Sequence, residues 1–280
     1  MEKFPQRKVE KAPKNQVTPL EKIRTDAEKS LHEAEGQLEI LKGSLQNLAH
    51  CIEEEKPDVL IFLDLSARMF GTPFLKYLRE TMGDSAPQIR FYNDQELKGG
   101  YLSGEDVANI AKRDFSNLSG KKVFFIDETF STGKGVGALQ EAFKVIDADM
   151  KYFALSKNPD PKFQDELGLS TETQEVKRNE ILQHPNVVVY DNPIQVLFSR
   201  NMRSLYVQDW QGKTITLSGR SKTTQKSSGT FPSVDSFYAP PPGMTMDEYK
   251  KEESQIVDSL VRRVKDKIYT TLTDKEASNP

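Results

Sequence analysis

The sequence contains a single cysteine, Cys51, among its 280 residues, and only three histidines, which lie far apart. One cysteine excludes an intrachain disulfide framework and a cysteine-rich zinc site, and the histidines lack the spacing of metal ligands. The first residues contain no apolar segment of the kind that forms a secretory signal, and no stretch is apolar enough to cross a membrane. We therefore expect a cytoplasmic protein without a membrane partner.

An excess of one charge sign is also lacking. Lysine and arginine together number 39, and aspartate and glutamate 42, which gives a net charge of -3. Because this balance provides no general attraction to phosphate backbones, it argues against a nucleic-acid partner. Residues 212–233 contain lysine and arginine without any acid. A nucleic-acid-binding surface there stays open as a weaker alternative to a solvated loop.

Composition divides the chain into five segments. Residues 1–17 are basic, polar and predicted to be disordered. Residues 18–56 form an N-terminal helical extension, in which leucines recur every three or four positions along one face. An α/β domain is predicted for residues 57–211, followed by a flexible basic loop and proline-rich linker at 212–243 and by a C-terminal helix and tail at 244–280. The apolar faces of the two helical extensions are expected to pack on the core or to mediate a homo-oligomer.

The clearest chemical pattern lies in residues 121–139, KKVFFIDETFSTGKGVGAL. Its apolar run is typical of a strand buried on both faces of a parallel sheet. Asp127 and Glu128 follow at the expected carboxyl end of that strand. A loop rich in hydroxyls and glycine, residues 129–135, then leads into a predicted helix. Ligands of open α/β sheets bind beyond the carboxyl ends of strands, and the start of a helix attracts anions.

This layout fits a phosphorylated sugar. The hydroxyls, backbone N–H groups and lysine of the loop suit a phosphate, whereas the two carboxylates suit sugar hydroxyls or Mg²⁺. A P-loop is excluded, because it would need a glycine where Glu128 stands and a serine or threonine where Gly135 stands. An ordinary strand-turn-helix with polar residues at the start of the helix remains the alternative.

The same run resembles the phosphoribosyl pyrophosphate (PRPP) motif of type I phosphoribosyltransferases, in which apolar residues lead into two acids, two variable positions and Ser/Thr-Thr-Gly. The resemblance implies that Asp127 and Glu128 are the catalytic-site acids that hold the ribose hydroxyls. It implies that the 5′-phosphate is bound by Ser131, Thr132, Gly133, Lys134 and Gly135. Gly135 departs from the family pattern, which usually has threonine at that position.

Two further segments match the family less closely. A strand is predicted at residues 59–63, and the family's pyrophosphate-binding loop would then correspond to Leu65, Ser66, Ala67 and Arg68, before a helix that begins near Pro73. Arg68 can pair bidentately with pyrophosphate, and a surface salt bridge is an equal alternative. The glycine-rich residues 93–104 correspond to the family's flexible loop, with Lys98 as its basic residue, although a simple turn explains them as well.

The resemblance implies an α/β fold with a parallel-sheet, phosphoribosyltransferase-like (Rossmann-like) core between N-terminal and C-terminal helical extensions. It implies a glycosyltransferase of nucleotide metabolism that binds PRPP or a related phosphoribosyl ligand with Mg²⁺ and transfers ribose 5-phosphate to a nitrogenous acceptor, releasing pyrophosphate. No residue is assigned directly to the metal. The alternative is a catalytically inactive module of the same fold with a regulatory or protein-interaction role.

Overall fold

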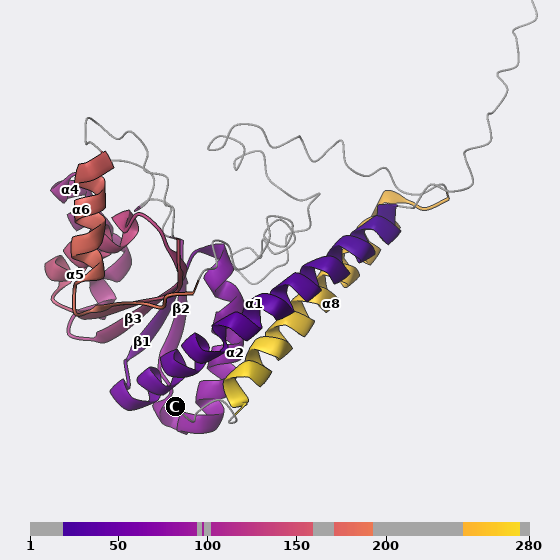
Figure 1. Cartoon of the computed structure of the whole chain (residues 1–280), viewed down its shortest axis with the longest axis horizontal. Coiled ribbons are helices and arrows are strands. Elements are labelled where there is room, and N and C mark those ends of the chain that lie inside the picture. Colours follow the sequence, from indigo (N-terminus) through magenta and orange to yellow (C-terminus); the bar gives the residue numbers. More distant parts are fainter. Residues whose placement is uncertain (1–18, 94–96, 98–101, 159–170, 193–242, 275–280) are drawn as a thin grey trace, which may run out of the picture.

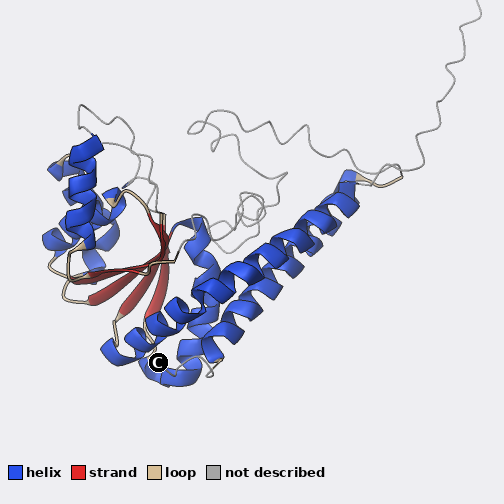
Figure 2. Ribbon diagram, viewed as in Figure 1, coloured by secondary structure: helices blue, strands red, loops and turns tan. Residues whose placement is uncertain are grey.

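The computed structural model describes residues 19–93, 97, 102–158, 171–192 and 243–274. The predictions for residues 1–17 and 212–242 therefore lie outside the described residues. Helices cover both faces of a central sheet (Figures 1 and 2). The strands are β1 (Val59–Leu63), β2 (Gln88–Tyr92), β3 (Lys122–Phe130), β4 (Asp149–Lys157) and β5 (Val187–Val189). The helices are α1 (Pro19–Glu55), α2 (Asp64–Met82), α4 (Gly104–Ile110), α5 (Lys134–Ile146), α6 (Thr171–Leu182) and α8 (Met246–Thr273), with short helical turns at Gly83–Ser85, Ala111–Phe115 and Ser116–Leu118.

The sheet consists, within the described residues, of five strands in the order β2-β1-β3-β4-β5, and every neighbouring pair is parallel. This arrangement confirms the predicted α/β fold class with a parallel-sheet core. Strands β1 and β3 are apolar along their paired lengths, as expected for central strands with helices on both sides. Ile61, for example, lies opposite Phe125 in the register of these two strands, and both side chains are buried.

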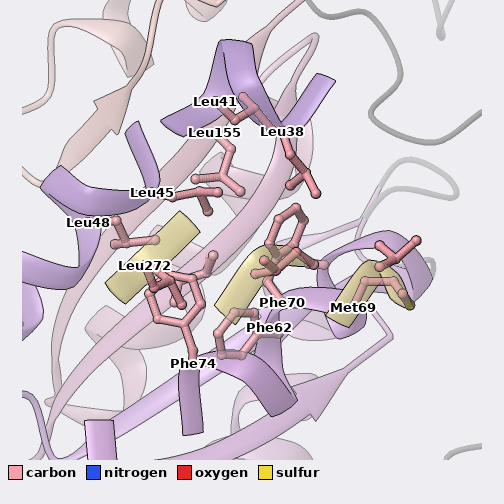
Figure 3. Close-up of a cluster of buried hydrophobic side chains, with 14 of the residues drawn as sticks. Leu38, Leu41, Leu45, Leu48, Phe62, Met69, Phe70, Phe74, Leu155 and Leu272 are labelled. Atoms are coloured by element: carbon pink, nitrogen blue, oxygen red, sulfur yellow. The ribbon is translucent and has the colours of Figure 1, made fainter. Parts of the chain in front are cut away.

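Alternate residues along the strands belong to two separate hydrophobic clusters, one on each face of the sheet. Phe62, Phe124 and Phe153 point to the face covered by α1, α2 and α8, and Figure 3 shows part of this cluster. Phe125 and Tyr152 point to the opposite face, which α4 and α5 cover. This two-sided burial follows from the period of two along a strand, and it fixes the register of each strand.

Helix α1 is continuous through both of its glycines, Gly36 and Gly43, and a Cβ atom added at either position would meet no other atom within 4 Å. Its buried apolar residues repeat in steps of three and four, the heptad spacing of a helix that packs along another helix. The leucines nearest the sheet pack on β4 and α2, whereas the other end of α1 extends away from the sheet beside α8 (Figure 1).

The parts of α1 and α8 that extend away from the sheet form an arm. Both helices run in the same direction, from the far end of this arm towards the sheet. At the far end, Arg24 forms an ion pair with Glu252 at 3.4 Å, and at the sheet end the Gln46 side-chain amide donates to the backbone carbonyl of Thr271. The apolar faces of both helices are thus used against each other and against the core of this chain. Among the described helices, none is long and apolar enough to span a bilayer.

The end of α1 is fastened to the sheet by ion pairs. The Glu55 carboxylate lies 2.8 Å from Lys122 Nζ, at the start of β3, and also pairs with Lys151 of β4. Cys51 Sγ donates to the same carboxylate at 3.0 Å. Burial disfavours the charged carboxylate, but the hydrogen bonds from Lys122 and Lys151 outweigh it and lower the pKa of Glu55 to about 2.

Helix α2 begins at Asp64, directly after β1, and the prediction that it begins near Pro73 is wrong. Residues 65–68 accordingly form helical turns and no loop. Helix α2 starts early because Ala67, Phe70 and Phe74 fall on one face and are fully buried against the sheet. That burial also accommodates Pro73 inside the helix, where its ring removes one backbone hydrogen bond.

Candidate functional site

The sheet has a topological switch point between β1 and β3. The chain leaves β1 for α2 on one face and leaves β3 for α5 on the other face, as Figure 1 shows. The next strands, β2 and β4, then lie on opposite sides of this central pair. Ligands of open α/β sheets bind at such a point, beyond the carboxyl ends of the strands. Residues 65–68 and the loop after β3 both lie at this edge.

Asp127 and Glu128 lie within the last part of β3, near the carboxyl end of the strand, as predicted. The strand continues to Phe130, because its last residues still pair with β4, opposite Ser156 and Lys157. Successive residues of a strand face opposite sides of a sheet. The two carboxylates therefore point to different faces of the sheet.

The Asp127 carboxylate is occupied by the protein itself. Its Oδ1 atom accepts a hydrogen bond from the backbone N–H of Glu128 at 2.7 Å, and its Oδ2 atom accepts one from the Tyr152 hydroxyl at 3.0 Å. Only 6% of Asp127 and 1% of Tyr152 are exposed. A buried acid with such partners stabilises the local fold, because each bond compensates the loss of water around the carboxylate.

Glu128 is even more deeply buried, with 1% of its surface exposed. Its backbone carbonyl accepts a hydrogen bond from the Ser156 hydroxyl at 2.9 Å. The same hydroxyl lies 2.8 Å from that of Thr129. These bonds join the last part of β3 to β4 and extend the pairing of the two strands beyond the acids.

The predicted phosphate loop forms the turn from β3 into α5. Ser131 and Thr132 are partly exposed, and Gly133 has φ 80° and ψ -4°, a conformation that favours glycine. Lys134 and Gly135 belong to the first turn of α5. The N–H groups at the start of a helix have no partner in the helix's own hydrogen-bond ladder, and together with the helix dipole they attract anions. The structure thus gathers these five residues at the start of one helix.

Two residues that sequence reasoning missed fix this loop. The Arg178 guanidinium, from α6, donates to the backbone carbonyl of Ser131 at 2.7 Å and to that of Asn158 at 3.0 Å, and it lies over the ring of Phe130. The Asn158 N–H donates to the carbonyl of Phe130 at 2.8 Å, and its side-chain amide donates to the Ser131 hydroxyl at 3.3 Å. No sequence motif marks either residue, since Arg178 stands 47 positions after Ser131.

The remaining predicted site residues are those of the pyrophosphate loop and the flexible loop. Residues 65–68 lie at the start of α2, where Ala67 is fully buried. Lys98 lies outside the described residues. In the part of the chain that the structure describes, no group of three or more histidine, cysteine, aspartate or glutamate side chains is arranged to hold a metal ion.

No protein-family model matches the sequence, and no curated protein matches it. Among solved structures, the chain is similar to a purine phosphoribosyltransferase from Pyrococcus horikoshii. The two chains are 19% identical, the match covers 46% of this chain and 77% of that one, and the TM-score is 0.29. This is a distant likeness, and no assignment to a family rests on it.

Proposed function

We propose that this chain is a phosphoribosyltransferase-like module that binds the 5′-phosphate of a phosphoribosyl ligand without transferring the sugar. The phosphate would lie at the turn from β3 into α5, against the hydroxyls of Ser131 and Thr132 and the first N–H groups of the helix. The position of this turn beside the switch point of the sheet supports the location.

The burial of Asp127 carries the second half of the proposal. A transferase of this type would need the acidic pair to hold the ribose hydroxyls while the bond to pyrophosphate breaks. Here both oxygens of Asp127 accept hydrogen bonds from the protein, and Glu128 points to the opposite face of the sheet. Residues 65–68 are helical where a pyrophosphate-binding loop would be needed. The ligand would therefore be held mainly by its phosphate.

The described residues do not fit a Mg²⁺ ion held by the protein alone. Such an ion prefers several oxygen ligands in an octahedral arrangement, and the two neighbouring carboxylates diverge from each other. Ions of this kind are often bound through one or two carboxylates and the phosphates of a substrate. We therefore propose that any Mg²⁺ would enter with the pyrophosphate of PRPP and would not be needed for the binding of ribose 5-phosphate.

Calorimetric titration tests the binding. We expect ribose 5-phosphate and 2-deoxyribose 5-phosphate to bind with affinities within about twofold of each other, because Asp127 is held by the protein and Glu128 points to the opposite face of the sheet. The change Thr132→Val keeps the shape of the side chain and removes its hydroxyl, so it should weaken both ligands by roughly tenfold, the value of one hydrogen bond to a charged group. Absence of binding at millimolar ligand, in a folded protein, would refute the phosphate site.

A second experiment tests the lack of transfer. PRPP is incubated with Mg²⁺ and a panel of purine and pyrimidine bases, and released pyrophosphate is measured. We expect no release above the rate without protein. The double variant Asp127→Asn/Glu128→Gln should bind ribose 5-phosphate as the unchanged protein does, provided that its melting curve shows it to be folded. Base-dependent release of pyrophosphate that disappears in this variant would establish a transferase and overturn the proposal.

A further inference from the structure

Helix α6 is attached to the rest of the molecule through a small number of side chains. None of its residues is buried, and it lies beside α5 on the same side of the sheet (Figure 1). Ile181 and Leu182 are its partly buried apolar residues, and they pack against the cluster on the α5 side. A helix with so little burial has little packing energy to hold it in place, so each of its remaining contacts carries more weight.

Several of these contacts are made with the proposed phosphate loop. Arg178 donates from two nitrogens to two backbone carbonyls, one at Ser131 in the loop and one at Asn158 after β4. Asn158 and Ser131 are also joined directly, since the Asn158 side chain donates to the Ser131 hydroxyl. The planar guanidinium matches two acceptors at once, which a lysine ammonium does not do with a fixed geometry.

An apolar contact completes the attachment. The terminal carbon of Ile181 lies so close to Gly133 that a Cβ atom on that glycine would be only 3.1 Å away, and it lies 3.4 Å from the corresponding position on Gly137. Helix α6 thus touches the loop with both a cation and a methyl group. The loop conformation and the position of α6 are therefore two parts of one packed arrangement.

We infer that Arg178 positions the phosphate loop and links it to α6, so that a phosphomonoester bound at the loop stabilises the docked position of this helix. The inference rests on the proposed phosphate binding. It gives a module without turnover a way to signal that its ligand is bound. Coupling of this kind is reciprocal: the factor by which the ligand favours the docked helix equals the factor by which docking of the helix strengthens ligand binding.

Hydrogen exchange and calorimetry test this link on the full chain, with ribose 5-phosphate as the probe. In the unchanged protein, saturating ligand should slow exchange of the α6 amides by about fivefold or more, the lower range of such couplings. Arg178→Ala should weaken the ligand about tenfold and abolish the slowing in α6. Lys177→Ala is the matched control, because it removes the same charge from an exposed neighbouring position and should leave both readouts within about twofold.

The conservative change Arg178→Lys separates charge from geometry, and it carries the test if Arg178→Ala does not fold. It keeps the positive charge but not the fork that reaches two carbonyls, so we expect it to weaken the ligand and to reduce the slowing in α6. The inference is overturned if Arg178→Lys behaves as the unchanged protein in both readouts. It is also overturned if the ligand binds without any change in α6 exchange, or if Lys177→Ala loses as much affinity as Arg178→Ala. Failure of every protein to bind the probe refutes instead the phosphate site on which the inference rests.

Discussion

Replacement of Gly133 by alanine is predicted to destabilise the protein through two separable effects. The first is conformational, because Gly133 has φ 80° and a residue with a Cβ atom pays about 1–2 kcal/mol in the left-handed region. The second is steric, because the new Cβ atom would lie 3.0 Å from Phe130 Cζ and 3.1 Å from Ile181 Cδ1. Insertion of an atom into such a packed site typically costs about 1–3 kcal/mol. The free energy of unfolding should therefore fall by roughly 2–5 kcal/mol.

Two other glycines provide matched controls. Gly120 has φ 70° but no atom within 4 Å of the position of its Cβ, so Gly120→Ala isolates the conformational cost of about 1–2 kcal/mol. Gly137 lies within α5 with only an ordinary contact at 3.4 Å, so Gly137→Ala should be neutral or stabilising by up to about 1 kcal/mol.

Urea denaturation followed by circular dichroism measures all three changes. The steric effect is the difference between the losses for Gly133→Ala and Gly120→Ala, and we expect it to be at least about 1 kcal/mol. Equal losses for these two variants would refute the packing of α6 against the loop. Calorimetry on the same proteins should show weaker ribose 5-phosphate binding for Gly133→Ala alone, since only that change moves the loop.

Three further predictions concern the core and the cluster at the end of α1. Leu45→Ala removes a fully buried side chain and should cost about 3 kcal/mol of stability in urea, whereas Ile40→Ala, at a position 52% exposed, should cost less than about 0.5. Burial opposes the charge of Glu55, but hydrogen bonds led by that from Lys122 lower its pKa to about 2, below the ordinary value of 4.5. The stability that the Glu55 carboxylate contributes is complete above pH 4.5 and is lost as the pH falls from there to about 2. Glu55→Gln should therefore flatten the pH dependence of the free energy of unfolding in that range. Burial, aided by a hydrogen bond to Glu55, raises the pKa of the Cys51 thiol to about 11. Iodoacetamide at pH 8 should therefore alkylate Cys51 at least about tenfold more slowly in the folded protein than in the urea-unfolded chain. Equal rates of alkylation would contradict this prediction.

Sequence patterns could locate the helices and strands whose buried residues follow one regular spacing within a single segment. Two strands are marked by continuous apolar runs, at 59–63 and 123–126, which are typical of strands buried on both faces. Helix α1 is marked by leucines spaced three and four positions apart, which are typical of a helix buried on one face. The start of α2 cannot be predicted from the same pattern, because Pro73 is typical of the first residue of a helix, whereas burial of Phe70 and Phe74 continues the helix through it.

The candidate site was harder to predict because its geometry depends on partners distant in sequence. The end of β3 is set by its pairing with β4, and Tyr152, which holds Asp127, is 25 positions away. The turn from β3 into α5 can be predicted from local residues, since a glycine at the start of a helix leaves a clear pattern. Arg178 left none, because it stands in a polar helix that has no buried residues.

The parallel pairing of α1 and α8 has a consequence for how the chain is made. Gln46 and Thr271, which meet at the sheet end of the arm, are 225 positions apart. During translation the leucine stripe of α1 leaves the ribosome long before the helix that covers its outer half. Contacts of such long range form slowly, and uncovered apolar stripes attract chaperones and other unfolded chains. Premature termination anywhere before α8 would therefore release a product with an exposed, aggregation-prone helix.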